Sequence, residues 1–349
     1  MAGIFQSGMF ALGFDAEPTA AQVFTQNAIG SATATTPFSF GFAWNVAYTP
    51  GPGILFGTNL TTVYHGVRHI GNGSLPGSSA IMFDFYDATA GASQVTLRVN
   101  STGQLQFYLG SGTGTTIGSA SAASTIVQGV WQYIEVLVTI SATVGQVQCY
   151  VNGTQVITTA ASQNTKSTAN TFVNAFRFDS PSSSNDFYDD WYMLDNTGSS
   201  PFNTYLGPVQ VREEAPNANS AVGGRNAWTS TDANNYQAVA HIPASASHYD
   251  ADSTPGDYDM FRFPSLPSNV STVLAVNELA VVGLDSSGAR TVELNVYSNG
   301  TDGPGSAFTP AAIGSPTYYY LVQTVDPHTS SAWTVANASA AEIGVKLQS

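Results

Sequence analysis

Apolar and polar residues alternate along much of the chain, which is the pattern of strands with one buried face. From Phe38 to Tyr48 every second residue is aromatic or valine. A period of two places such residues on one face of a strand. Shorter alternations follow at residues 81–85, 95–99, 105–109 and 172–178, and Gly, Asn or Ser turns bound most of them. The pattern therefore predicts many short strands.

Two stretches indicate how these strands are arranged. Residues 131–140, WQYIEVLVTI, are apolar on both faces, as expected of a central strand that is covered on both sides. Residues 146–156, QVQCYVNGTQV, place Asn152-Gly153 between two strand-like runs. This dipeptide tolerates the positive φ angles of a tight turn, so we expect a hairpin that turns Cys149 inward.

The second half of the chain follows the same pattern. Residues 273–284, 292–297 and 318–325 are rich in β-forming residues and are separated by turn sequences. An alanine-rich stretch at 334–342 predicts a short helix capped by Thr334. Residues 343–347 then predict a final strand.

Composition agrees with an all-β protein and excludes several function classes. Only 9% of the 349 residues are charged, and the formal net charge is −14. That charge, without a Lys/Arg cluster, argues against a nucleic-acid partner. Cys149 is the only cysteine, so no disulfide can form within the chain. No apolar run approaches membrane-spanning length, and the N-terminal residues do not form a secretory signal.

The most unusual stretch is acidic and aromatic: residues 185–198, NDFYDDWYMLDNTG. Strict alternation would put Tyr188, Asp190, Tyr192 and Leu194 on one face of a strand, and Asp189, Trp191, Met193 and Asp195 on the other. The carboxylates would then point to opposite faces and could not work as a pair. We therefore interpret the stretch as the closing strand of a first domain and the start of a linker.

The order of several motifs resembles the concanavalin A-like, laminin-G-like jelly rolls. The motifs are G-x-L-x-x-Y at 103–108, G-x-W-x-x-I-E-V at 129–136, V-N-G at 151–153 and D-D-x-Y-x-L-D at 189–195. Past residue 198 the chain resembles virion proteins of tailed phages and prophages that join such a jelly roll to a second β domain. The stretches that carry this resemblance are 205–217, 227–239, 249–263, 272–282 and 332–348. The sequence departs from the usual pattern at 49–57 and before it.

The resemblance implies an all-β protein with a jelly roll at 1–204 and a second, smaller antiparallel β-sandwich at 205–349. It implies a non-enzymatic structural protein on the exterior of a phage particle, on its tail or attachment apparatus, made in the cytoplasm of the host bacterium. Other virion proteins would be its partners, and a homo-oligomer is expected, with a trimer as the first choice. The alternatives are a capsid decoration protein and an adhesin that binds host-surface polysaccharide.

We find no catalytic residues in the sequence. It lacks the E-x-D-x-E strand of the glucanase jelly rolls, whose two carboxylates face one groove. His65 and His69 lie in HGVRH, which lacks the glutamate of a zinc peptidase, so we interpret them as surface or turn residues. His241, His248 and His328 are scattered, and no G-x-S-x-G motif occurs.

Two binding sites remain as candidates, each with a simpler alternative. Tyr188, Trp191 and Trp228 could stack on sugar rings beside carboxylates, although aromatic residues in strands more often form core or subunit contacts. Asp250, Asp252, Asp257 and Asp259 could converge on a calcium ion. Pro255 stands where an EF-hand needs glycine, so we favour a solvated acidic loop there and expect no other cofactor.

Overall fold

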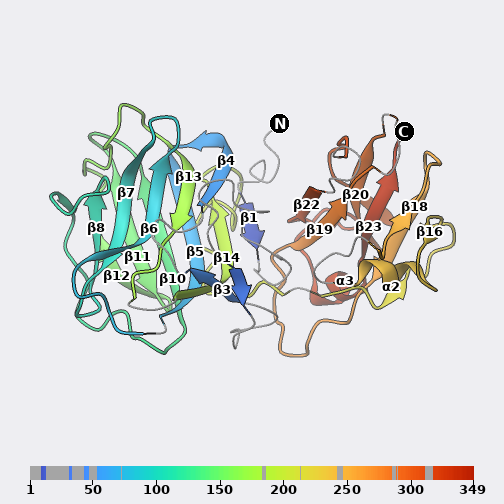
Figure 1. The fold of residues 1–349 in the computed structure, drawn as a ribbon, viewed down its shortest axis with the longest axis horizontal. Coiled ribbons are helices and arrows are strands. Elements are labelled where there is room, and N and C mark those ends of the chain that lie inside the picture. The colour runs from blue at the N-terminus through green and yellow to red at the C-terminus, as the bar shows by residue number, and fades with distance from the viewer. Residues whose placement is uncertain are drawn as a thin grey trace. The chain divides into compact units, whose positions relative to one another are not determined.

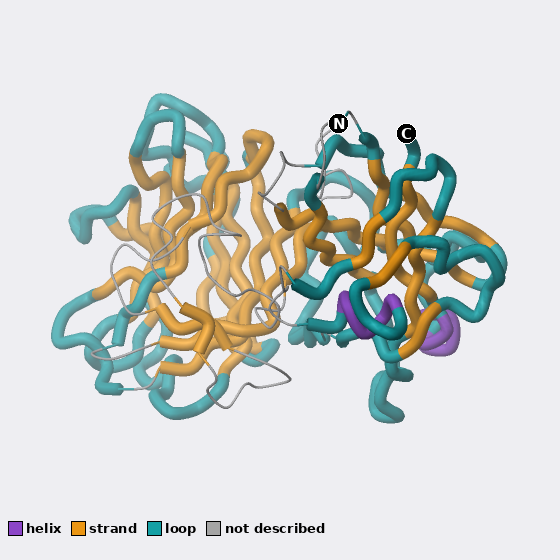
Figure 2. The backbone as a smooth tube through the Cα atoms, turned by 45° about the vertical axis from the view of Figure 1, so that its right-hand side comes forward, coloured by secondary structure: helices purple, strands orange, loops and turns teal. Residues whose placement is uncertain are grey.

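The computed structural model describes residues 9–12, 31–33, 43–46, 53–71, 73–182, 186–212, 214–241, 247–284, 288, 290–310 and 317–349. The chain divides into two compact units, residues 1–213 and 214–349. Every strand pairing in these ranges is antiparallel, which confirms the predicted all-β class. The two described helices, α2 (Asn235–Val239) and α3 (Val335–Ala340), are short and belong to the second unit (Figure 2).

Two antiparallel sheets form the first unit (Figure 1). The larger sheet contains β1 (Met9–Leu12), β2 (Ser31–Thr33), β3 (Ala43–Val46), β5 (Thr62–Gly71), β10 (Gln132–Thr139), β11 (Gln146–Val151), β12 (Thr154–Thr158) and β14 (Asp186–Leu194). Its order is β12-β11-β10-β5-β14-β3-β2, with β1 paired to β14. The smaller sheet contains β4 (Gly53–Leu60), β6 (Ala80–Asp87), β7 (Ala92–Val99), β8 (Leu105–Leu109), β9 (Thr116–Ile117) and β13 (Val173–Phe178), in the order β4-β13-β6-β7-β8-β9. One apolar core lies between the two sheets.

Most of the strand predictions for this unit are confirmed. β10 lies between β5 and β11 and is almost wholly buried, as expected of a central strand. Asn152 and Gly153 turn the β11–β12 hairpin with φ angles of 50° and 77°, and Cys149 is fully buried. The predicted strand at 38–48 lies mostly outside the described residues, and β3 covers residues 43–46 of it.

β14 departs from strict alternation, so the two faces that we predicted for it are wrong. Its register against β5 shifts between Asp189 and Tyr192, and Asp190 has a φ of 50°. The inserted residue is a β-bulge, which changes the face on which the following side chains lie. As a result Tyr188 and Trp191 both lie in the core.

Gly66 on β5 makes room for this bulge. A Cβ atom at residue 66 would lie 2.2 Å from Cε1 of Tyr192, so the Tyr192 ring occupies the space that a side chain would need. A glycine is therefore required at this point by the close approach of the ring.

Residues 205–211, which we call the strap, follow β14 and belong to the first unit. We predicted a domain boundary after residue 204, whereas the units divide after residue 213. The difference arises because the strap is hydrogen-bonded to β10 and β14 through contacts described below.

The second unit contains a five-stranded sheet and two short ribbons. The sheet has β15 (Ala218–Asn219), β18 (Tyr258–Arg262), β20 (Val292–Ser298), β21 (Thr301–Pro304) and β23 (Glu342–Leu347), in the order β15-β18-β23-β20-β21. The ribbons are β16 (Thr229–Ser230) with β17 (Asp250–Ala251), and β19 (Val276–Val282) with β22 (Thr317–Gln323).

A small core joins the five-stranded sheet to β19, β22 and α3. Its buried centre is Val296, Trp333 and Ala341. Side chains of β19, β22, β23 and α3 pack against this centre. The predicted helix cap is confirmed, since the Thr334 hydroxyl accepts a hydrogen bond from the Asn337 amide at 3.1 Å. The predicted last strand is β23.

Candidate functional site

Two of the three aromatic residues that we assigned to glycan binding are buried. Tyr188 and Trp191 have no exposed surface, and both pack among phenylalanines of the smaller sheet. A sugar ring cannot reach the face of either aromatic ring without opening the core, so this assignment is wrong for both residues. Trp228 is partly exposed, and its Nε1 points to the carbonyl oxygen of Asp257 at 3.5 Å.

The buried carboxylates of β14 are bound by partners inside the first unit. One oxygen of Asp186 lies 2.8 Å from Nε2 of His69, and the other accepts hydrogen bonds from Ser180 and Ser182. Asp190 Oδ2 accepts from Nε of Arg68 at 2.9 Å. A carboxylate at such depth needs hydrogen-bond partners, and both of these have them.

The strap supplies the remaining partners of this cluster. The Gly207 amide donates to Oε1 of Glu135 at 2.9 Å, and the Val211 amide donates to Oδ1 of Asp190 at 2.9 Å. In the opposite direction, Nη2 of Arg68 donates to the Val209 carbonyl at 3.3 Å.

Two tyrosines complete this contact. The hydroxyl of Tyr192 donates to Glu135 and accepts a hydrogen bond from the Leu206 amide at 3.1 Å. The ring of Tyr205 lies against Tyr64 and Tyr150, with centroid distances of 5.1 and 4.8 Å. Side chains of β10 and β14 thus act as acceptors for the strap, and Tyr64 of β5 and Tyr150 of β11 form the surface on which Tyr205 packs.

His65 and His69 are buried on β5, which contradicts their interpretation as surface or turn residues. They lie four apart on a strand, and both side chains therefore face the core. Trp191 Nε1 donates to Nδ1 of His65 at 2.8 Å. Phe83 and Phe176 pack around the His65 ring. Burial lowers the pKa of His65 well below its usual value, so the ring is neutral in the folded protein.

A second buried acid lies on the smaller sheet. Asp84 on β6 is paired with Arg177 of β13, accepts from the Ser93 hydroxyl at 3.0 Å, and is 2% exposed. The Arg177 guanidinium lies 3.9 Å from the centroid of the Tyr86 ring, which is partly exposed. Burial raises the pKa of Asp84 despite the arginine beside it.

In the second unit, the four aspartates that we assigned to calcium lie near one another as two pairs. Asp250 faces Asp259, and Asp252 faces Asp257. Burial, together with the neighbouring Asp250, raises the pKa of Asp259 to about 9. At neutral pH a proton on Asp259 therefore offsets the repulsion within the first pair.

These aspartates do not form one compact cage. Within the described ranges, the group of three donor side chains whose ligand atoms all lie within 4.8 Å of one another contains other residues. Calcium needs six to eight oxygen ligands. Buried oxygens of Asp250 and Asp252 could supply some of them, so calcium binding stays a prediction.

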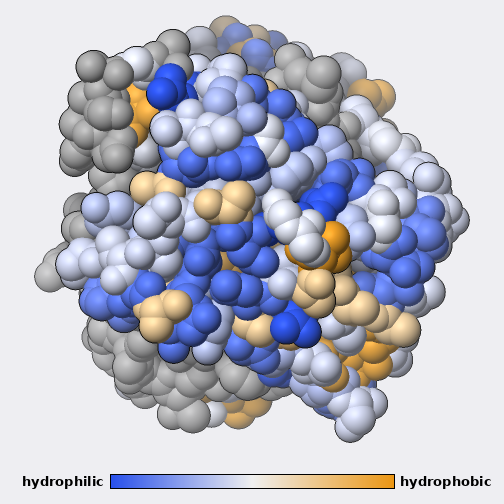
Figure 3. Space-filling model, turned by 90° about the vertical axis from the view of Figure 1, so that its right-hand side faces the viewer, coloured by the Kyte–Doolittle hydropathy of each residue, from blue (hydrophilic) through white to orange (hydrophobic). Residues whose placement is uncertain are grey.

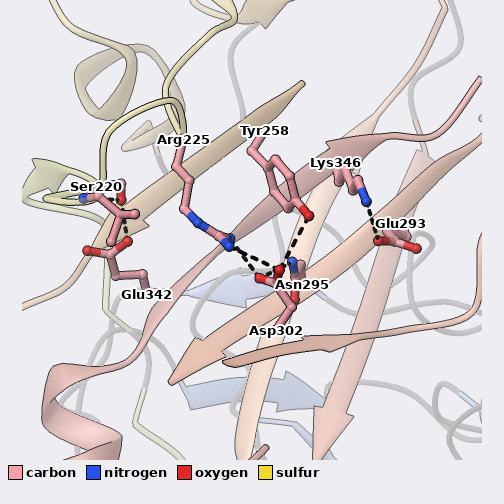
Figure 4. Close-up of polar contacts among 9 residues, drawn as sticks. Ser220, Arg225, Tyr258, Glu293, Asn295, Asp302, Glu342 and Lys346 are labelled. Atoms are coloured by element: carbon pink, nitrogen blue, oxygen red, sulfur yellow. Dashed lines mark hydrogen bonds and ion pairs between the residues drawn. The ribbon is translucent and has the colours of Figure 1, made fainter. Parts of the chain in front are cut away.

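The outer face of the five-stranded sheet carries a polar network that the sequence did not reveal (Figure 4). Arg225 forms two hydrogen bonds to the carboxylate of Asp302, at 2.7 and 3.0 Å. Its guanidinium also lies over the rings of Tyr258 and Tyr297, at 4.5 and 4.2 Å from their centroids. Asn295 donates to the same carboxylate at 2.9 Å, so the network fixes Arg225 over the sheet.

Comparison with protein families agrees with the fold of the first unit. The family model described as the concanavalin A-like lectin/glucanases superfamily matches residues 72–189, which run from the end of β5 into β14. The first unit is a concanavalin A-like jelly roll. No curated protein matches the sequence.

Several solved structures are distantly similar to the chain. Alginate lyase Aly36B is 15% identical over 55% of this chain and 98% of its own, with a TM-score of 0.36. The cellulose induced protein Cip1 is 14% identical over 60% of this chain and 100% of its own, with a TM-score of 0.39. A sialidase of Trypanosoma rangeli is 12% identical over 55% of this chain and 31% of its own, with a TM-score of 0.35. Scores of this size say nothing about what this chain does.

Removal of the Asp190 carboxylate should release the strap from the jelly roll. In Asp190→Ala the Val211 amide loses its acceptor and Arg68 loses its carboxylate partner. A lost buried hydrogen-bond partner costs roughly 1–3 kcal/mol, so we expect trypsin to cleave after Arg212 about tenfold faster or more. Mass spectrometry of timed digests measures the rate.

Asp84→Ala is the matched control, because it also removes a buried carboxylate from an arginine but leaves the strap contacts in place. If this control accelerated cleavage after Arg212 equally, the effect would be general destabilisation, and the role of Asp190 as an anchor for the strap would be refuted.

The neutral, buried His65 should make the jelly roll less stable in mild acid. Below about pH 6.5 the unfolded chain takes up a proton on residue 65 that the folded chain does not, so the unfolding free energy falls as the pH falls. The slope from this group reaches about 1.4 kcal/mol per pH unit. Urea unfolding at pH 5 to 7 should show a shallower slope for His65→Gln, and equal slopes would contradict the assignment.

Proposed function

We propose that the protein is a non-enzymatic structural component of a tailed-phage particle, displayed on the exterior of the tail or its attachment apparatus. The observation that carries this proposal is the use of the acidic cluster on β10 and β14. Glu135 and Asp190 are bound by the strap, and Asp190 is also bound by Arg68. Side chains in this state stabilise a rigid module and are not available to a substrate.

The sequence resemblance to virion proteins supports the placement on a particle, since it extends through both units. Other virion proteins are the proposed partners, and a homo-oligomer, with a trimer as the first choice, is the proposed assembly. The face in Figure 3 is mostly hydrophilic, with apolar residues in small groups. Contacts made through that face would therefore be largely polar. No helix among the described residues is both long and apolar enough to span a membrane.

A capsid decoration protein is the alternative within the same class, because a β module of this kind can be fixed to a head shell as well as to a tail. The concanavalin A-like fold supports a second candidate, an adhesin that binds host-surface polysaccharide. Since Tyr188 and Trp191 are buried, its sugar surface would lie elsewhere. The partly exposed Tyr86 beside Arg177 is the aromatic and charged pair that we propose for it.

Purified phage particles provide the test of this proposal. Immunogold electron microscopy with an antibody against the chain should place the label on the tails of intact particles. Label on the heads would support the decoration protein and would contradict the tail assignment. Absence of the chain from particles, measured by mass spectrometry, would contradict both.

A glycan array separates the structural role from the adhesin. The structural role predicts no reproducible binding to bacterial surface polysaccharides and no shortening of them after long incubation. Binding that is lost in Tyr86→Ala would instead support the adhesin. Trp191→Ala is not a suitable variant, because it would leave a large cavity in the core.

A further inference from the structure

Residues 230–232 and 248–250 of the second unit run side by side as an antiparallel ribbon. Ser230 pairs with Asp250 in the ladder of β16 and β17. Next to this pair, the Thr231 amide donates to the Tyr249 carbonyl at 3.1 Å. Residues two apart on such segments lie on the same face. Asp232 and His248 are therefore neighbours on the face that also carries Asp250.

A second histidine reaches this face from the end of α2. The ring of His241 stacks on the ring of His248, with centroids 4.2 Å apart and planes inclined by 29°. Nδ1 of His248 lies 2.9 Å from Oδ2 of Asp232, and Nε2 of His241 lies 3.9 Å from the same oxygen. One carboxylate oxygen and two imidazole nitrogens thus all lie within 4.8 Å of one another.

The donor set determines which ion would fit. Two imidazoles and one carboxylate suit zinc and neighbouring transition metals, whereas calcium and magnesium prefer oxygen ligands alone. Tetrahedral zinc with bonds of about 2.1 Å holds its donor atoms about 3.4 Å apart. The two distances to the Asp232 oxygen lie on either side of that value, so a small rotation of the side chains would complete the geometry.

We propose that Asp232, His241 and His248 bind a divalent transition-metal ion of the zinc type. The side chains are 25%, 43% and 38% exposed, so an ion can enter from solvent and water can fill a fourth position. This site is separate in its ligands from the calcium prediction, and it does not depend on the proposed role in a phage particle.

Asp250 adds negative charge beside these three ligands. It lies two residues from His248 on the same face of the ribbon, opposite Ser230. A further carboxylate on this face favours a cation over an anion near the three ligands.

An ion pair between His248 and Asp232 alone is the competing explanation. That pair accounts for the short contact of His248, but it does not account for His241. Nε2 of His241 points to the same oxygen from 3.9 Å, which is beyond hydrogen-bonding distance. A shared metal ion explains why both rings approach one carboxylate.

The test is a titration of the full chain with zinc chloride after treatment with EDTA and its removal. Isothermal titration calorimetry should find one bound zinc ion per chain, and cobalt(II) should give visible absorption bands at the same stoichiometry. Because each histidine supplies a ligand, His241→Gln and His248→Gln should each weaken binding at least about tenfold.

His328→Gln is the matched control, since His328 belongs to the same unit but contacts Asn299 and Thr301 instead. It should bind zinc as the unchanged chain does, and far-UV circular dichroism should show that all variants are folded. The proposal is overturned if the chain binds no zinc at equimolar concentration, or if the double variant His241→Gln/His248→Gln binds it with unchanged affinity. Calcium binding that persists in the double variant would be assigned to the aspartates of the calcium prediction and would not count as support for the zinc site.

Discussion

The arrangement of the first unit depends on one requirement, that buried backbone amides and buried carboxylates find partners. The strap crosses the outer face of the larger sheet, where its amides would lose water without gaining an acceptor. Glu135 and Asp190 supply two of these acceptors, and Tyr192 supplies another. In return the strap amides and Arg68 stabilise carboxylates that could not stay charged at this depth alone. The strap amides and the buried carboxylates are each stable in these positions only because the other is present.

The bulge in β14 makes the hydrogen bonds between the strap and the carboxylates geometrically possible. With strict alternation, Asp189 and Asp190 would point to opposite faces, and Trp191 would leave the core. The extra residue brings Trp191 back into the core and directs Asp190 toward Arg68 and the strap. Gly66 leaves room for the Tyr192 ring at the same point. The acidic and aromatic stretch at 185–198 therefore contains a structural anchor.

Local signals allowed much of the fold to be predicted from the sequence. The period of two, the Asn152-Gly153 turn and the Thr334 cap each act within a few residues, and each is found where it was expected. The bulge was missed because a positive φ at an aspartate leaves no mark in the pattern. The strap was missed because its partners lie far along the chain, 72 residues away for Glu135 and Gly207. The stacking of His241 on His248 likewise depends on the path of the ribbon and α2, and not on their spacing in sequence.

The central claim is that the acidic cluster holds the strap against the jelly roll. Hydrogen exchange at single-amide resolution tests it most directly, because it measures the protection of the amides concerned. The amides of Leu206, Gly207 and Val211 should exchange as slowly as those of the buried strand β14. Exchange at the rate of the exposed loop 111–114 would contradict the claim, because it would show that the carboxylates do not hold these amides in solution.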